Sequence, residues 1–157
     1  MKKNGQKTVI TNRKAFHDFE ILEKLEAGIV LKGTEVKSVR AGRVSFKDSY
    51  AKVVDGELWV VNMHISPYDH GSSWNHDPLR ARKLLLHKRE IKRLIGKIEE
   101  RGLTLVPLRL YFKNGIAKVE LAIARGKKLH DKRRDIAKRD SDRDMQRELK
   151  DRFRLKV

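Results

Sequence analysis

Apolar and polar residues alternate in two pairs of segments, and a tight-turn dipeptide separates the members of each pair. The pairs are residues 49–54 and 57–62 around Asp55-Gly56, and residues 103–113 and 116–124 around Asn114-Gly115. Asp-Gly and Asn-Gly favour the positive φ angles of two-residue turns between antiparallel strands. The pattern therefore predicts two β-hairpins.

The later hairpin also predicts which side chains are buried. Apolar residues occupy alternate positions from Ala117 to Ile123, and Lys118 and Glu120 lie between them. Successive side chains of a strand point to opposite faces, so the apolar set is expected in the core and the charged pair outside. Pro107 cannot donate a hydrogen bond to a neighbouring strand and is expected at an edge or a bulge.

Helical spacing is clearest between the two hairpins, where Gly102 is expected to end the helix. The apolar residues with this spacing are Leu84, Leu85, Ile91, Leu94, Ile95 and Ile98. Residues 19–31 suit one long bent strand with a kink or bulge at Gly28, although a helix is the competing interpretation. Thr34 is expected to cap a short helix over residues 35–41 that ends at Gly42.

The two ends of the chain differ in composition from its middle. Residues 1–13 contain few bulky apolar groups and are expected to form a loose, flexible arm. Residues 125–157 contain 14 Lys or Arg and 7 Asp or Glu. We expect residues 126–157 to be disordered in the free protein, because they cannot bury enough apolar surface to offset their ordering entropy. A helix formed against a partner is left open by the four-residue spacing of Met145, Leu149, Phe153 and Val157.

Residues 14–125 are then expected to be the folded domain. Many short strands, two hairpins and one substantial helix predict a mainly β fold with flanking helices. A small oligonucleotide-binding-type (OB-like) β-barrel fits this size and these elements, and a β-sandwich remains the alternative.

Composition narrows the function to partners that carry negative charge. The 157 residues include 38 Lys or Arg and 21 Asp or Glu, a formal net charge of +17, and polyanions are the natural ligands of such a chain. The absence of Cys excludes disulfides, a thiol nucleophile and cysteine-bound zinc, and suits the reducing cytoplasm. No stretch approaches the roughly 20 apolar residues of a membrane span, so no membrane partner is expected.

A nucleotide loop and a metal site are both disfavoured by residue type and spacing. Gly126-Lys127 lacks the earlier glycine and the following Ser or Thr of a phosphate-binding loop, because Leu121 and Lys128 stand at those places. The close cluster with metal-ligand chemistry is His70, His76 and Asp77. It lacks the spacing of a metal site, so a hydrogen-bonding loop is expected there and no metal or cofactor is assigned.

A metal-independent ribonuclease is a further alternative. His130 beside Asp131 resembles a general base with its orienting partner, and Lys132 or a neighbouring arginine would stabilise developing negative charge. Catalysis needs rigidly placed groups, however, and a weakly hydrophobic tail gives them no supporting shell. No catalytic residue is therefore assigned.

RNA binding is predicted where basic residues are interleaved with flat or apolar groups. The segments "NRKAFHDF" and "DPLRARKLLL" have this composition. The side chains suited to phosphates and unpaired bases are Arg13, Phe16, His17, Arg80, Arg82 and Lys83.

Four segments resemble the SsrA-binding protein family, or small protein B, the bacterial partner of transfer-messenger RNA. They are "NRKAFHDF", "LEAGIVLKGTEVKSVRAGRVSFKDSYAKV", "NHDPLRARKLLLHKREI" and "GKKLHDKR". The resemblance implies an oligonucleotide-binding-type barrel without catalytic activity that binds the tRNA-like domain of transfer-messenger RNA. It also implies delivery of that RNA with elongation factor Tu to stalled ribosomes, for rescue and peptide tagging (trans-translation). A general translation-associated RNA-binding barrel is the alternative.

The resemblance further implies which residues contact the RNA and the ribosome. The RNA contacts are Glu26, Leu85 and Lys118, with Asn12, Arg13 and His17 of the first motif. Contacts in the decoding centre of the small ribosomal subunit come from the tail residues Lys127, Lys128, His130, Asp131, Lys132 and Arg133. Residues beyond them line the messenger channel as an induced helix.

Overall fold

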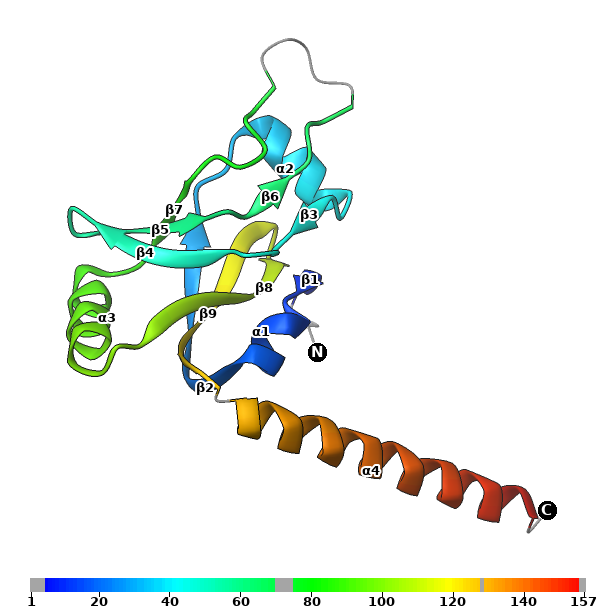
Figure 1. Cartoon of the computed structure of the whole chain (residues 1–157). Helices are drawn as coiled ribbons and strands as arrows, with labels where there is room; N and C mark the ends of the chain where they lie inside the picture. The colour runs from blue at the N-terminus through cyan, green and yellow to red at the C-terminus, as the bar shows by residue number, and fades with distance from the viewer. Residues whose placement is uncertain (1–4, 70–74, 128, 156–157) are drawn as a thin grey trace. The chain divides into compact units, whose positions relative to one another are not determined.

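A long antiparallel hairpin joins strands β8 (Thr104–Lys113) and β9 (Ile116–Gly126) in the computed structural model (Figure 1). Asn114 and Gly115 form its turn, with φ angles of 52° and 80°. Positive φ at both positions is the geometry that the dipeptide predicted. The structure describes residues 5–69, 75–127 and 129–155.

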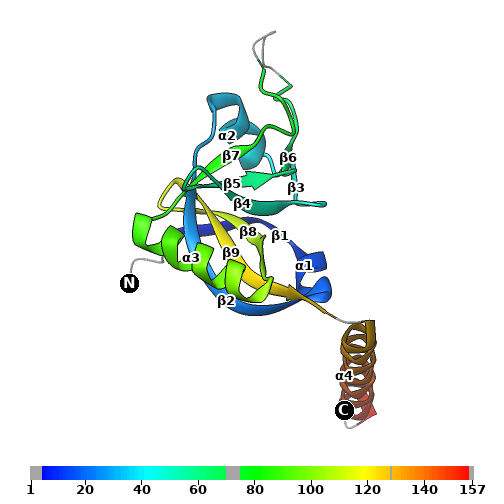
Figure 2. The ribbon, with the colours of Figure 1, turned by 60° about the vertical axis from the view of Figure 1, so that its left-hand side comes forward.

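The second predicted hairpin is also present, because β4 (Tyr50–Val54) and β5 (Glu57–Val61) pair around Asp55 and Gly56. The other strands are β1 (Gln6–Thr11), β2 (Phe19–Ile29) and β7 (Arg82–Leu85), with a separate pair β3 (Val44–Ser45) and β6 (His64–Ile65). The sheet order is β1-β8-β4-β5-β7-β2-β9, and β8 also pairs with β9, so the strands close into a ring (Figures 1 and 2). This mainly β architecture with flanking helices confirms the predicted fold class.

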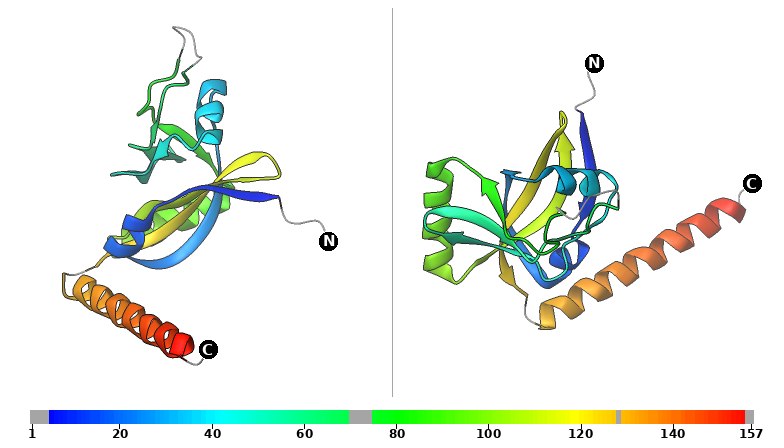
Figure 3. Two further views of the ribbon diagram at one scale, coloured as in Figure 1. Left: turned by 90° about the vertical axis from the view of Figure 1, so that its right-hand side faces the viewer. Right: turned by 90° about the horizontal axis from the view of Figure 1, so that it is seen from above.

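Strands β1 and β2 give different outcomes for the sequence predictions. The single long strand expected near residues 19–31 is confirmed by β2, which bends along its length (Figure 3). Residues 6–11, expected in a loose arm, instead form β1, which pairs with β8 from Gln6 opposite Lys113 to Thr11 opposite Arg109. The edge of β8 supplies the backbone partners that the local sequence of this segment does not reveal.

Residues 1–125 form the first of two compact units, and its helices are α1 (Arg13–Asp18), α2 (Gly33–Arg40) and α3 (Lys88–Arg101). Helix α3 ends at Gly102, whose φ of 60° is the predicted left-handed stop. Leu84 and Leu85 share the helical spacing but belong to β7, because that segment pairs with β5 and β2. Thr34 is not the cap of α2, since the helix already begins at Gly33.

The hydrophobic core is formed by inward side chains of the ring. Its fully buried residues include Leu58, Val60, Leu84, Leu105, Leu110, Val119, Leu121 and Ile123. The alternate apolar positions of β9 therefore face the core as predicted. The register of β8 and β9 shifts between Pro107 and Arg109, which confirms the irregularity expected at this proline.

The outer face of the β8–β9 hairpin has an apolar half and a polar half. Helix α1 covers the apolar half, where Ala15 packs against Val106, Leu108, Ala122 and Ala124. Beyond the bulge, the paired outward positions hold Arg109 and Glu120, then Tyr111 and Lys118. Side chains of strand β2 contact this polar half, where Glu26 accepts from Tyr111 and Lys24 lies 3.7 Å from Glu120.

Residues 126–157 form the second of two compact units. They contain helix α4 (Leu129–Leu155), on which Ile136, Met145 and Leu149 are 45%, 59% and 54% exposed. Disorder of this tail in the free protein stays a prediction. No helix in the described part of the chain is long and apolar enough to cross a membrane.

Candidate nucleic-acid interface

Leu85 is a large apolar side chain at the surface, with 51% of its area exposed. It lies in β7 opposite Gly28 of β2. A Cβ atom on Gly28 would lie 3.3 Å from the Leu85 Cβ, so the glycine leaves the space that this side chain occupies. Leu85 therefore presents an apolar surface over the β7–β2 pair, suited to packing against a base.

Glu26 lies two residues before Gly28 and so projects from the same face of β2. Its Oε2 accepts a short hydrogen bond from the Tyr111 hydroxyl, and its Oε1 lies 3.6 Å from the Lys113 Nζ. The hydrogen bond lowers the pKa of Glu26; partial burial opposes this, and the charges of Lys113 and Lys118 lower it further. Glu26 is therefore an ionised, oriented acceptor at neutral pH.

Tyr111 is held in place as the donor to Glu26. Burial and the Glu26 carboxylate raise the pKa of Tyr111 above its ordinary value, so the hydroxyl keeps its proton. The Arg109 guanidinium lies 5.6 Å from the centroid of the Tyr111 ring. Arg109 also donates to Glu120 through both Nε, at 2.8 Å, and Nη2. These contacts hold the Tyr111 ring so that its hydroxyl donates to Glu26.

Glu26, Leu85 and Lys118, which we call the Glu26 face, come from three strands that are neighbours in the sheet, β2, β7 and β9. The face combines an ionised acceptor, an apolar side chain and a cation. A carboxylate accepts hydrogen bonds from base edges, leucine packs on exposed bases, and lysine binds phosphate. This arrangement can recognise a folded RNA with accessible bases.

Arg82 was predicted to contact RNA, but the structure buries it completely, at 0% exposure. Its Nε donates to the equally buried Glu35, and its Nη1 and Nη2 donate to the carbonyls of Met63, at 2.5 Å, and Pro78, at 3.2 Å. Arg80 donates to the other oxygen of Glu35. The prediction for Arg82 is wrong because strand alternation turns this side chain inward; Arg80 is 27% exposed but is committed to the same carboxylate.

Lys83 follows Arg82 in β7 and faces outward. Its Nζ donates to Glu57 at 2.9 Å, and the two side chains are 38% and 48% exposed. Exposed pairs of this kind contribute little to stability, so Lys83 can exchange Glu57 for a phosphate. RNA contact by Lys83 remains a prediction that the geometry permits.

The motif "NRKAFHDF" supplies three predicted RNA contacts, Asn12, Arg13 and His17, which lie at the start of helix α1 and within it. Asn12 accepts from the Ala15 backbone N–H at 3.2 Å and donates to the Pro107 carbonyl at 2.9 Å. It therefore caps α1 and fixes the helix against β8. Arg13 is exposed, and His17 contacts Asp18 at 3.0 Å, so these two remain candidates for RNA contact.

His76 belongs to a hydrogen-bonding loop, as its spacing predicted. Its Nδ1 lies 2.8 Å from the Thr34 hydroxyl, and its Nε2 lies 2.9 Å from the Ile65 carbonyl oxygen. Asp77 accepts from the Leu79 backbone N–H at 2.9 Å. His70 lies outside the described residues.

A protein-family model described as "SmpB protein" matches residues 9–151. The chain belongs to the SmpB family. The SsrA-binding protein of Carboxydothermus hydrogenoformans is 60% identical over 148 residues, which are 94% of this chain and 99% of the relative. The SsrA-binding protein of Acetivibrio thermocellus is 61% identical over 154 residues, 98% of this chain and 100% of the relative.

A solved structure is also similar to this SmpB-family chain. It is described as "tmRNA-SmpB: a journey to the center of the bacterial ribosome". The matching chain is 61% identical, with a TM-score of 0.65, and the match covers 76% of this chain and 85% of that chain. The resemblance seen in the sequence is thereby confirmed at the level of family and fold.

The tail residues predicted for the SmpB-family chain lie at and after the start of α4. Lys127 precedes the helix and is half-buried, whereas Arg133 is exposed on α4. The structure describes only the backbone of His130, Asp131 and Lys132, which belongs to α4. Lys128 lies outside the described residues. The decoding-centre contacts therefore stay predictions.

Tyr111 and Arg109 support the Glu26 face of this SmpB-family chain but were not identified from the sequence. A signal for them exists in the Asn114-Gly115 turn. A two-residue turn sets the register of its strands, and counting outward from it pairs Tyr111 with Lys118 and Arg109 with Glu120. The contact of Tyr111 with Glu26, 85 residues away, has no comparable local signal.

Proposed function

We propose that this SmpB-family chain is a non-enzymatic RNA-binding adaptor of ribosome rescue. It binds the tRNA-like domain of transfer-messenger RNA and, with elongation factor Tu, delivers it to stalled ribosomes in the cytoplasm for trans-translation. The names of its relatives and of the similar solved structure support transfer-messenger RNA and the ribosome as partners. The observation that carries the proposal is the Glu26 face, where adjacent strands present an acceptor, an apolar side chain and a cation.

Each group of the Glu26 face has a separate task. The Glu26 carboxylate accepts from the N–H groups of a base edge, which a phosphate-binding cation cannot do. Leu85 packs on an exposed base, and Lys118 neutralises a phosphate. Tyr111 is a positioning residue, because it holds Glu26 and is itself 3% exposed.

The test is the affinity of transfer-messenger RNA for the full chain and its variants, measured by fluorescence titration at one salt concentration. The salt is fixed because counterion release makes RNA affinity steeply salt-dependent. The site variants are Glu26→Ala, Leu85→Ala and Lys118→Ala. Exposed residues of the same types elsewhere in the fold supply the matched controls Glu99→Ala, Leu79→Ala and Lys52→Ala.

Each site variant is expected to weaken binding by at least about fivefold, the effect of losing about 1 kcal/mol, and the controls are expected to bind like the native chain. The Glu26 variant is decisive. Removing a negative charge should strengthen nonspecific attraction to RNA. An affinity for Glu26→Ala equal to or higher than that of the native chain overturns the assignment of the face.

The tail is assigned to the ribosome in the same proposal. Residues 126–133 enter the decoding centre, and the segment beyond them occupies the messenger channel as a helix. Its basic composition suits ribosomal RNA. The Glu26 face belongs to residues 1–125 and the tail is residues 126–157, which are two separate compact units. Removal of the tail should therefore abolish tagging activity and leave RNA affinity unchanged.

Two other functions give different results in simple assays. A general translation-associated RNA-binding protein would lose transfer-messenger RNA to excess transfer RNA, whereas the adaptor would retain it. A ribonuclease would cleave labelled RNA with multiple turnover, whereas the adaptor would leave it intact.

A further inference from the structure

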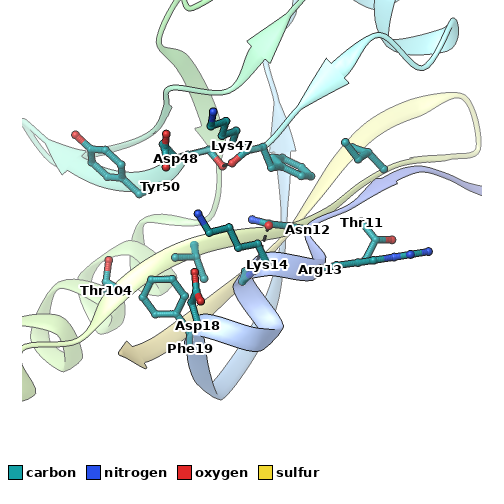
Figure 4. Close-up of a pocket in the computed structure, with 15 residues that line it drawn as sticks. Thr11, Asn12, Arg13, Lys14, Asp18, Phe19, Lys47, Asp48, Tyr50 and Thr104 are labelled. Atoms are coloured by element: carbon teal, nitrogen blue, oxygen red, sulfur yellow. Dashed lines mark hydrogen bonds between the residues drawn. The ribbon is translucent and has the colours of Figure 1, made fainter. Parts of the chain in front are cut away.

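A cleft of about 540 Å³ lies between helix α1 and the loop before β4, and it shares no residue with the Glu26 face (Figure 4). One wall is the segment from Ile10 to Phe19, and the other is residues 46–50. Thr104 and Val106 of β8 line it between them. Sites for small ligands have volumes of about 300–1,000 Å³, so this space accommodates one nucleotide.

Both walls of the cleft are fixed by hydrogen bonds. Asn12 caps one wall and is tied to β8, as described above. In the other wall, the backbone N–H of Ser49 donates to the Phe46 carbonyl at 2.9 Å, and the Ser49 hydroxyl donates to the same oxygen at 2.6 Å. Asp48 is held at a φ of 59°, and Asn62 donates to its carbonyl at 3.4 Å. The cleft is therefore preformed.

Three cations and two carboxylates, Asp18 and Asp48, are among the residues that line the cleft. Arg13, Lys14 and Lys47 line the cleft and are exposed, and no salt bridge joins them to another group in the described part of the chain. Figure 4 shows Lys14 reaching from α1 toward the wall that bears Lys47 and Asp48, while Arg13 points away from the opening. These exposed ammonium groups suit phosphates.

Flat side chains stand on the two walls. Tyr50, which is 38% exposed, belongs to β4, and Phe19 lies across the cleft from it (Figure 4). Aromatic rings beside cations are the combination that binds unpaired bases, because every base can stack and every nucleotide carries a phosphate. We propose that this cleft binds one unpaired base of an RNA strand, with Lys14 and Lys47 contacting the adjoining phosphates.

The probe is a short RNA duplex with a single bulged adenosine. Its matched controls are the same duplex with an abasic bulge and the same duplex fully paired, because a paired base cannot enter the cleft. The full chain is expected to bind the bulged duplex at least about fivefold more tightly than either control, as one stacked base provides. The amide signals of Thr104 and Val106 in NMR spectra are expected to shift on binding.

Variants then locate the base. Tyr50→Ala should abolish the preference for the bulge, and Tyr50→Phe should keep it because the ring remains. Lys14→Ala and Lys47→Ala should each reduce the slope of log affinity against log salt by about one. Lys52→Ala, which removes a neighbouring exposed lysine outside the cleft, should keep the preference for the bulge.

Equal binding of the three duplexes overturns the inference, and so does a bulge preference that survives Tyr50→Ala. A preference that is lost in Glu26→Ala instead would place the base on the Glu26 face and also overturn it. The test is separate from that of the adaptor function, because these duplexes contain no part of transfer-messenger RNA.

Discussion

The buried carboxylate of Glu35 offers a sharp test of how the fold is held together. Glu35 and Arg82 are each 0% exposed and hydrogen-bonded to one another. Replacing Glu35 by Gln keeps the shape but leaves a buried guanidinium without its counter-charge. Breaking a buried pair in this way lowers the free energy of unfolding by about 3–5 kcal/mol. We expect a loss near ~3 kcal/mol, because the amide oxygen of Gln still accepts one hydrogen bond. Folding free energies of domains are about 5–15 kcal/mol, so the loss is a large share of the total.

The assay is urea unfolding followed by circular dichroism. With a slope of about 1.5 kcal/mol per M, the expected loss lowers the unfolding midpoint by about 2 M. Glu99→Gln, at an exposed position of α3, is the control and should leave the midpoint unchanged. Replacing both partners, as Glu35→Leu with Arg82→Met, should recover only part of the loss, because it removes the buried charges but leaves Arg80 and the carbonyls of Met63 and Pro78 without these hydrogen bonds. A midpoint for Glu35→Gln equal to that of the native chain would refute the reasoning.

The pH dependence of this difference has a definite sign. Burial would raise the pKa of Glu35, but hydrogen bonds from the Lys32 backbone and from Arg80 and Arg82 lower it overall. A carboxyl with a lowered folded-state pKa stabilises the fold above its unfolded pKa of about 4.3, and this contribution is lost as pH falls through the folded value. The difference between the native chain and Glu35→Gln should be constant from neutral pH to about pH 5 and shrink in stronger acid.

The other predictions concern the Glu26 face and the tail. Tyr111→Phe should return the pKa of Glu26 toward 4.5, read by NMR titration, and weaken transfer-messenger RNA binding about fivefold through loss of one hydrogen bond; an unchanged titration contradicts the positioning role. Gly28→Ala should displace Leu85, since the new Cβ would lie 3.3 Å from it, and weaken RNA binding while costing only about 1 kcal/mol of stability; unaltered affinity would show that the Leu85 position is not critical. Truncation before Gly126 should leave RNA affinity unchanged and abolish peptide tagging on stalled ribosomes, and normal tagging by the truncated chain would refute the tail assignment.

Local patterns predicted the parts of the fold that depend on neighbouring residues. The Asn114-Gly115 turn predicted its hairpin, and the alternation from Ala117 to Ile123 predicted the core face of β9. Strand β1 was not predicted, because its pairing depends on the edge of β8, about 100 residues away in the register. Leu84 and Leu85 were grouped with the following helix, since periodicity alone does not separate a short strand from a helix.

Some residues of the candidate site were also predictable from local patterns, and others were not. Outward placement of Lys118 followed from strand alternation, whereas roles for Glu26 and Leu85 came only from the family resemblance. Arg82 was misassigned because its partner Glu35 lies 47 residues earlier, and a basic residue beside other basic residues gives no local sign of burial. The sequence pattern could not predict which charged residues pair when they are far apart in the chain.

The most direct measurement is the identity of the RNA that co-purifies with the full chain from its own cells, compared with a Glu26→Ala/Lys118→Ala variant. The chain is expected to bring down transfer-messenger RNA far above its share of total RNA, and the variant is expected to lose this enrichment while Glu99→Ala/Lys52→Ala keeps it. Enrichment of ribosomal or transfer RNA in its place, or equal enrichment of transfer-messenger RNA by the Glu26→Ala/Lys118→Ala variant, would contradict the adaptor function assigned to the Glu26 face.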